Sequence, residues 1–119
     1  MLIRVLLIDD SKFSRNNMKR FLSDDKYEII GEAVDGLDGL EQYKSLQPDL
    51  IITDLEMPNL DGIGMIKEIR KIDSKAKIVI VTSVVNAQII KEASRLQASV
   101  VTKPIKNDRL LNVIKLLDR

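Results

Sequence analysis

The sequence predicts an α/β protein of the (βα)5 type, a doubly wound sheet of five parallel strands with helices on both faces. Two patterns indicate it. Short apolar segments alternate five times with segments of helical spacing. Three of the apolar segments are almost continuous runs of Val, Ile and Leu, which is typical of strands buried on both faces of a parallel sheet. Such alternation implies right-handed crossovers, and the 119 residues suit one domain over 1–119.

The five strands differ in how apolar they are. They are expected at Ile3–Ile8, Glu28–Ala33, Leu50–Thr53, Ile78–Thr82 and Ser99–Thr102. The first, third and fourth are nearly all aliphatic, whereas the second and fifth carry more polar residues, as strands at a sheet edge do.

Each segment after a strand begins with a residue that can cap a helix and continues with apolar residues three or four positions apart. The expected caps are Ser11, Asp35, Asp61, Asn86 and Asn107. The expected inner faces are Met18, Phe21 and Leu22, then Leu37, Leu40 and Tyr43, then Ile63, Ile66 and Ile69, then Ile89, Ile90, Ala93 and Leu96, then Leu110, Leu111, Ile114 and Leu117. Gly36 and Gly62 each follow a cap and are interpreted as conformational glycines.

Composition excludes several kinds of chemistry. The chain has no Cys and no His, which removes thiolate metal sites, imidazole bases and Ser–His triads. A metal site made of carboxylates alone indicates a hard cation such as Mg²⁺. The net charge of +1 argues against a general nucleic-acid binder. With no membrane-length apolar run and no signal-peptide pattern, we expect a cytoplasmic protein without membrane contact.

Reactive side chains follow four of the expected strands. Asp9-Asp10 follows the first strand, Asp54 the third and Lys103 the fifth, while the fourth ends in Thr82. Because parallel strands end at one edge of a sheet, these groups are expected to meet there. One Asp after a strand is commonly a helix cap, but three carboxylates in one cleft repel each other unless a cation offsets them. Carboxylate, hydroxyl, lysine and metal together fit phosphoryl transfer to an aspartate.

These motifs resemble those of the response-regulator receiver domain of the CheY-like type. They are Val5-Leu6-Leu7-Ile8-Asp9-Asp10, Asp35-Gly36, the segment 54–62 (Asp-Leu-Glu-Met-Pro-Asn-Leu-Asp-Gly), Val81-Thr82-Ser83 and Thr102-Lys103-Pro104. Each motif is weak alone, but their order along nearly the whole chain is highly specific. The resemblance implies the flavodoxin-like strand order 2-1-3-4-5.

The resemblance also implies roles for individual residues. Asp54 would be the phospho-acceptor. Asp10 would bind Mg²⁺ directly, Asp9 would assist through water, and Asp54 and the backbone carbonyl of Glu56 would complete the protein ligands. Thr82 would contact the phosphoryl group, and Lys103 would pair with Asp54 and then with the phosphate. The Lys103–Pro104 bond is expected to be cis. The protein would catalyse only its own phosphorylation and dephosphorylation, and in that sense is not an enzyme.

A sensor histidine kinase or phosphotransfer protein is the phosphoryl donor that the resemblance implies. The downstream target would bind the face formed by the fourth helix, fifth strand and fifth helix, where Lys91, Arg95, Lys106 and Arg109 lie. These cations fit an acidic partner, although they equally fit an ordinary solvated surface. One position departs from the family: Val100 replaces the aromatic residue usual three positions before the lysine. A valine cannot act as a rotating aromatic lever, so the conformational readout is expected elsewhere.

Two other functions are compatible with such a fold. A phosphorylation-independent interaction module would be favoured by loss of an acidic residue or of the lysine, and all of them are present. A flavodoxin-type binder of a small molecule is disfavoured because aromatic residues make up only 3% of the chain and no phosphate-binding loop follows the first strand. The chain is expected to be a stand-alone CheY-like protein or the receiver part of a longer regulator.

Overall fold

The computed structural model describes residues 2–106 and 108–117, which form five consecutive βα units. In chain order the elements are β1 (Ile3–Ile8), α1 (Lys12–Phe21), β2 (Tyr27–Ala33), α2 (Gly36–Leu46), β3 (Leu50–Thr53), α3 (Gly62–Ile72), β4 (Lys77–Thr82), α4 (Ala87–Arg95), β5 (Ser99–Thr102) and α5 (Arg109–Leu117). The strands pair in parallel in the order β2-β1-β3-β4-β5, as expected. Strands β2 and β4 each begin one residue earlier than predicted.

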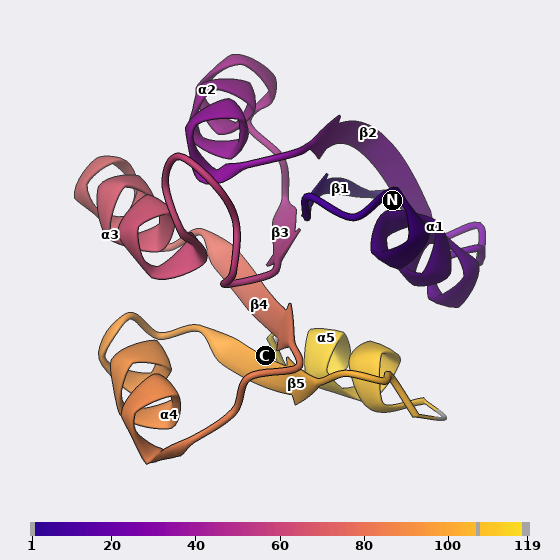
Figure 1. Cartoon of the computed structure of the whole chain (residues 1–119). Coiled ribbons are helices and arrows are strands. Elements are labelled where there is room, and N and C mark those ends of the chain that lie inside the picture. Colours follow the sequence, from indigo (N-terminus) through magenta and orange to yellow (C-terminus); the bar gives the residue numbers. More distant parts are fainter. Residues whose placement is uncertain (1, 107, 118–119) are drawn as a thin grey trace.

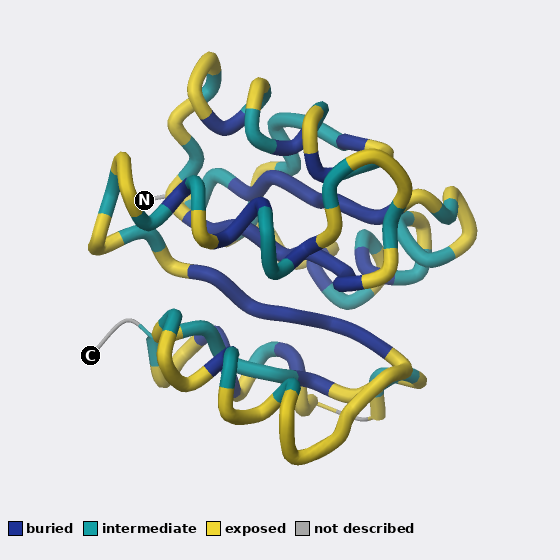
Figure 2. Tube along the Cα trace, turned by 60° about the vertical axis from the view of Figure 1, so that its left-hand side comes forward, coloured by how far each residue is buried: buried dark blue, intermediate teal, exposed yellow. Residues whose placement is uncertain are grey.

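The sheet separates two helical layers. Helices α1 and α5 cover one face, and α2, α3 and α4 cover the other (Figure 1). In β1, Val5 and Leu7 join the core on the α1–α5 face, whereas Leu6 and Ile8 join the core on the opposite face. All four side chains are inaccessible to solvent, and Figure 2 shows the buried strands between more exposed helices. Burial on both faces explains the uninterrupted aliphatic runs in the sequence.

Side-chain caps begin four of the helices. The backbone N–H groups of Ser14, Asp38, Gly64 and Ile89 donate to the side chains of Ser11, Asp35, Asp61 and Asn86, respectively. Each cap satisfies one of the N–H groups that a helix leaves unpaired at its start. These four predictions are confirmed, whereas Asn107 lies outside the described residues.

Two residues assigned to inner helix faces are instead exposed. Leu37 on α2 is 56% exposed and Ile90 on α4 is 54% exposed. Each is one residue away from the buried stripe of its helix, and one residue turns a helix by about 100°. The stripes that contact the sheet are therefore narrower than the apolar spacing suggested.

Gly36 and Gly62 have a steric role that differs from the predicted conformational one. None of the chain's five glycines has a positive φ. A Cβ on Gly36 would collide with the backbone carbonyl of Leu60, and a Cβ on Gly62 would collide with the carbonyl of Asp54. Both glycines therefore let the loop between β3 and α3 lie against two helix N-termini. This close approach fixes the path of the chain directly after Asp54.

Candidate functional site

The carboxyl edge of the sheet brings together the side chains predicted to react. The register pairs Ile8 with Thr53 and Thr82 with Thr102, so neighbouring strands end at matching levels. Asp9, Asp54 and Lys103 each directly follow the last residue of a strand. Parallel pairing in this register therefore turns positions far apart in the chain into neighbours.

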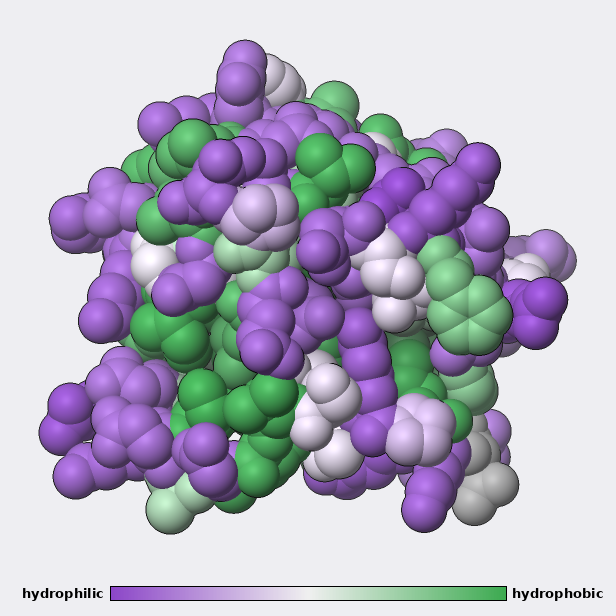
Figure 3. All heavy atoms as spheres, in the orientation of Figure 1, coloured by the Kyte–Doolittle hydropathy of each residue, from purple (hydrophilic) through white to green (hydrophobic). Residues whose placement is uncertain are grey.

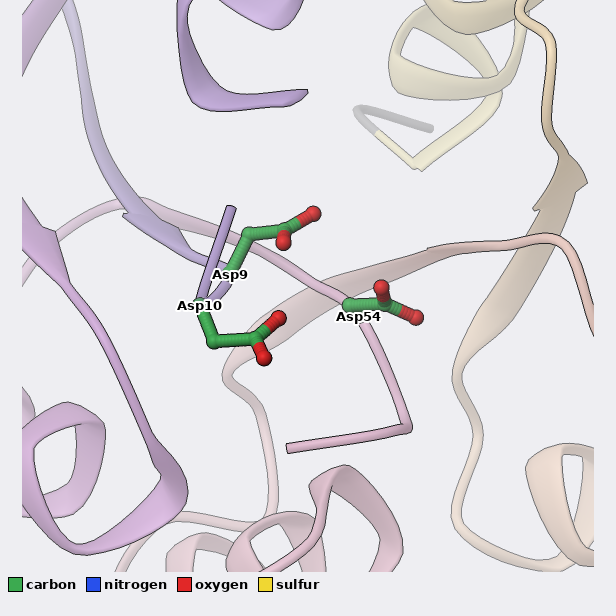
Figure 4. Close-up of side chains that lie close together, drawn as sticks. All are labelled: Asp9, Asp10 and Asp54. Carbon is green, nitrogen blue, oxygen red and sulfur yellow. The ribbon is translucent and has the colours of Figure 1, made fainter. Parts of the chain in front are cut away.

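Three carboxylates form one cluster at this edge. One carboxylate oxygen from each of Asp9, Asp10 and Asp54 lies within 4.8 Å of the others. Figure 4 shows Asp9 and Asp10 on the segment after β1, beside Asp54 on the segment after β3. Asp9 is fully buried, Asp54 is 9% exposed and Asp10 is exposed. The cluster thus extends from the interior of the protein to solvent.

The Lys103 ammonium contacts two carboxylates of the cluster. Its Nζ donates to Asp9 Oδ2 at 2.8 Å and to Asp54 Oδ2 at 2.9 Å, and it also donates to Ser14 Oγ at 3.2 Å. Burial alone would lower the pKa of Lys103, but the hydrogen bonds and negative charges of Asp9 and Asp54 raise it above its ordinary value. The ammonium therefore stays charged beside the two acids.

The three acids differ in how their remaining oxygens are used. Asp9 Oδ1 accepts from the backbone N–H of Ser11 at 2.9 Å, and Asp54 Oδ1 accepts from the N–H of Leu55 at 2.6 Å. Asp10 makes no hydrogen bond or ion pair within residues 2–106 and 108–117. The most exposed carboxylate is thus the one whose oxygens remain available to a ligand.

Thr82 and Glu56, the other two residues predicted for the site, differ in exposure. Thr82 is fully buried at the end of β4, and its Oγ1 accepts from the backbone N–H of Val84 at 3.2 Å. Glu56 lies two residues after Asp54 and is exposed. The Lys103–Pro104 peptide bond is cis, as expected.

The donor set fits a divalent hard cation. The cluster offers only oxygen ligands, and three carboxylates share one ammonium. This composition matches the preference of Mg²⁺ for carboxylate and carbonyl oxygens together with several waters. The excess negative charge would oppose close packing of the acids unless a cation were added.

Two residues of this edge were not singled out from the sequence. Ser14 contacts Lys103, and the Arg15 guanidinium donates to the backbone carbonyl of Asp9 at 2.6 Å and pairs with Glu32 at 2.9 Å. Both lie in the first turn of α1, four and five residues after Asp10. The sequence offers one indication of their role: when a helix begins directly after an acidic pair, the residues of its first turn lie near that pair.

A family comparison decides what kind of protein carries this site. The model of the response regulator receiver domain matches residues 5–115. The chain belongs to this family. Receiver domains are components of two-component signalling rather than conventional enzymes, and this chain is of the CheY-like type. The acidic cluster is consistent with the phosphorylation site of such a domain.

Individual relatives agree with this assignment of the receiver domain. The chemotaxis protein CheY of Thermotoga maritima is 37% identical over 112 residues, covering 93% of each chain. The solved response regulator domain of Thermotoga maritima CheB is 36% identical with a TM-score of 0.82, covering 99% of this chain and 92% of that one. A chain of the CheX–CheY–BeF3–Mg²⁺ complex of Borrelia burgdorferi has a TM-score of 0.93 at 24% identity, covering 98% and 90%.

The receiver domain shows no membrane-spanning element in its described part. Across residues 2–106 and 108–117, every helix falls short of the length and apolar character that crossing a bilayer requires.

Proposed function

We propose that the whole chain, residues 1–119, is one receiver domain that accepts a phosphoryl group on Asp54 from a histidine kinase or phosphotransfer protein. The observation that carries the proposal is the single ammonium of Lys103, which bridges Asp9 and Asp54 at 2.8 and 2.9 Å inside an acidic cluster. A structural salt bridge would match charges one to one, whereas this site leaves two carboxylates in excess. Such an excess suits chemistry that needs a cation and a carboxylate nucleophile together.

In the proposed reaction, a carboxylate oxygen of Asp54 attacks the phosphorus of a phosphohistidine. The new O–P bond forms as the N–P bond breaks, and the released imidazole takes up a proton from solvent. Lys103, already within hydrogen-bond distance of Asp54, donates to an oxygen of the transferred group. The Thr82 hydroxyl donates its hydrogen to the same group, because its present contact with the backbone N–H of Val84 uses only the oxygen as an acceptor.

The residues proposed to hold Mg²⁺ are those of the acidic cluster and its neighbouring loop. Asp10, whose carboxylate makes no hydrogen bond or ion pair within the described residues, would bind directly, and the fully buried Asp9 would assist through water. Asp54 and the backbone carbonyl of Glu56 would supply the other protein oxygens. When bound, the metal supplies positive charge that offsets the carboxylates and the incoming phosphoryl group.

Phosphorylation is proposed to change partner binding on the face of α4, β5 and α5, in a cytoplasmic protein. Exposed cations on this face are Lys91, Arg95, Lys106 and Arg109. Exposed apolar side chains also lie on α4 and the loop before it, where Figure 3 shows green atoms among purple ones: Val84, Val85 and Ile90. Val100 is half-buried against the core of the α2–α3–α4 face, so the readout is proposed to lie in α4 and this loop.

Intact mass measurement tests the proposed reaction. The protein is incubated with Mg²⁺ and a small acyl phosphate donor, beside Asp54→Asn and, as a matched control, Asp25→Asn at an exposed position outside the cluster. We expect wild type and Asp25→Asn to gain one phosphoryl group, and Asp54→Asn or chelated protein to gain none. A gain that survives in Asp54→Asn, or no gain in folded wild type with either the small donor or a phosphorylated phosphotransfer protein, would contradict the proposal.

A further inference from the structure

Ser14 brings α1 into contact with the lysine of the site. It is the third residue of α1, and its backbone N–H donates to the Ser11 cap at 3.2 Å. Its side chain has a separate role, because Ser14 Oγ accepts from Lys103 Nζ at 3.2 Å across 89 positions of sequence. The hydroxyl is therefore not needed to begin the helix.

The contact completes the hydrogen bonding of the Lys103 ammonium. An ammonium has three N–H donors and no acceptor. Lys103 Nζ has three acceptors, one each on Asp9, Asp54 and Ser14, and these come from three different segments of the chain. With the Lys103 side chain 22% exposed, this third acceptor holds the ammonium in the site rather than leaving one donor to solvent.

Ser14 differs from the two carboxylates in both charge and place. A hollow of about 270 Å³ lies beside α1 and the segment after β5, and its lining includes Ser14, Met18, Val81, Lys103, Pro104 and Ile105. The surface of the hollow is mostly apolar, and Ser14 is the polar lining residue whose hydroxyl accepts from Lys103. It is also neutral, and its contact with Lys103 does not depend on the charge that Asp54 carries.

We propose that Ser14 is a positioning residue for phosphoryl transfer: its hydroxyl anchors the Lys103 ammonium while the lysine changes partner from the Asp54 carboxylate to the phosphoryl group. The inference rests on the proposed function of Asp54 and Lys103. Formation of the acyl phosphate removes charge from the Asp54 oxygens and adds it to the phosphoryl oxygens. When the Ser14 hydroxyl holds the ammonium, Lys103 needs only a small rotation to reach the phosphoryl oxygens. Without that hydrogen bond the lysine side chain samples more conformations.

Three variants test the role of Ser14. Ser14→Ala removes the hydroxyl, Ser14→Thr keeps one, and Asn17→Ala changes another residue of α1 that lines the same hollow but is not among the hydrogen-bond acceptors of Lys103. We expect Ser14→Ala to lower the phosphorylation rate at saturating small donor by about three- to tenfold, the scale of the net contribution of one typical hydrogen bond. The donor concentration at half-maximal rate and the Mg²⁺ affinity should stay within twofold. Ser14→Thr should restore the rate, and Asn17→Ala should leave it unchanged.

A second readout does not depend on phosphorylation. Nuclear magnetic resonance relaxation of the Lys103 Cε methylene in metal-free protein should show greater mobility in Ser14→Ala than in wild type, Ser14→Thr or Asn17→Ala. Unchanged mobility in Ser14→Ala, or an equal rate loss in Asn17→Ala, would overturn the inference. If wild type accepted no phosphoryl group, the proposed function would fail on its own account, and equal Lys103 mobility in all variants would separately overturn the anchoring role.

Discussion

The two edges of the sheet receive opposite ends of the helices and treat their charged side chains differently. Helices that follow parallel strands run back along the sheet, so helix N-termini lie at the carboxyl edge and helix C-termini at the amino edge (Figure 1). The N-termini carry partial positive charge and the C-termini partial negative charge. Acids at one edge and cations at the other are therefore the arrangement that the helix dipoles favour.

At the amino edge, two arginines bind the carbonyls that helices leave unpaired. Arg4 donates to the carbonyls of Leu46 and Gln47 at the end of α2, at 2.9 and 2.8 Å. Arg70 donates to the carbonyls of Leu96 and Gln97 after α4, at 2.8 and 3.2 Å. Gln97 takes the left-handed conformation, with φ 56°, that ends α4. Each arginine has acceptors within the protein, so these contacts stabilise the ends of the helices at this edge.

At the carboxyl edge the balance is reversed. The cluster of Asp9, Asp10 and Asp54 has one ammonium for three carboxylates. Side-chain caps already satisfy the starts of the neighbouring helices, so the acids are not needed there as a group for capping. The comparison teaches that the two arginines at the amino edge find their acceptors within the protein, whereas the acidic cluster at the carboxyl edge keeps an excess of negative charge that a cation can offset.

Removing Arg70 should have the largest effect on stability. Arg70→Ala leaves the carbonyls of Ala76, Leu96 and Gln97 without their donor, and we expect the free energy of unfolding to fall by about 3 kcal/mol. Mg²⁺ affinity of the folded protein should not change. Urea unfolding beside Lys71→Ala, whose side chain is 72% exposed, checks this. If Arg70→Ala and Lys71→Ala lost similar free energy of unfolding, the hydrogen bonds of Arg70 to the helix-end carbonyls would not contribute to stability.

Neutralising Asp10 should have an intermediate effect whose sign depends on the metal. Without Mg²⁺, Asp10→Asn relieves repulsion and should stabilise the fold by on the order of 1 kcal/mol. Mg²⁺ at ten times its Kd should stabilise wild type by about 1.4 kcal/mol but not Asp10→Asn. Thermal unfolding with and without Mg²⁺ measures both, with Asp25→Asn as the matched acid at the amino edge. If Asp10→Asn were less stable than wild type without metal, repulsion among the three carboxylates would not destabilise the fold.

Tyr43 at the amino edge should give the smallest effect, visible chiefly in alkali. Burial and the hydrogen bond to Asp73 at 2.9 Å raise the pKa of Tyr43 to about 12 from its ordinary value of 10.0. The folded chain therefore keeps a proton that the unfolded chain loses between these pH values, so stability falls as pH rises from 10 to 12. Tyr43→Phe should cost about 0.5–1 kcal/mol at pH 7 and make that fall shallower. Urea unfolding at several pH values measures this fall, and an equally steep fall in Tyr43→Phe and wild type would refute the coupling.

Much of the site was predictable because strand ends are visible in sequence. Asp9, Asp54, Thr82 and Lys103 terminate or follow strands whose apolar runs stop abruptly, and a parallel sheet places such ends along one edge. The caps Ser11 and Asp35 were predictable for a similar reason, since a capping residue acts on N–H groups only three positions away.

Other features depended on distance in space rather than in sequence. The apolar spacing placed Leu37 and Ile90 on inner faces, but the width of each buried stripe is set by what packs against it. Gly36 and Gly62 were interpreted as conformational glycines, whereas they make room for the backbone carbonyls of Leu60 and Asp54. No local pattern reports which backbone segment will pass close to a given glycine.

The sequence by itself determined the alternation of strands and helices, the edge where the acids gather and the absence of imidazole and thiol chemistry. These follow from periodicity and composition, which are local properties. Only the tertiary structure decided that Lys103 reaches Asp9 across 94 positions and Ser14 across 89. It also decided that Arg70, rather than another cation, closes the end of α4. Side-chain partners depend on register, crossover and helix rotation together, and a shift in any of them would change which atoms lie within hydrogen-bond distance.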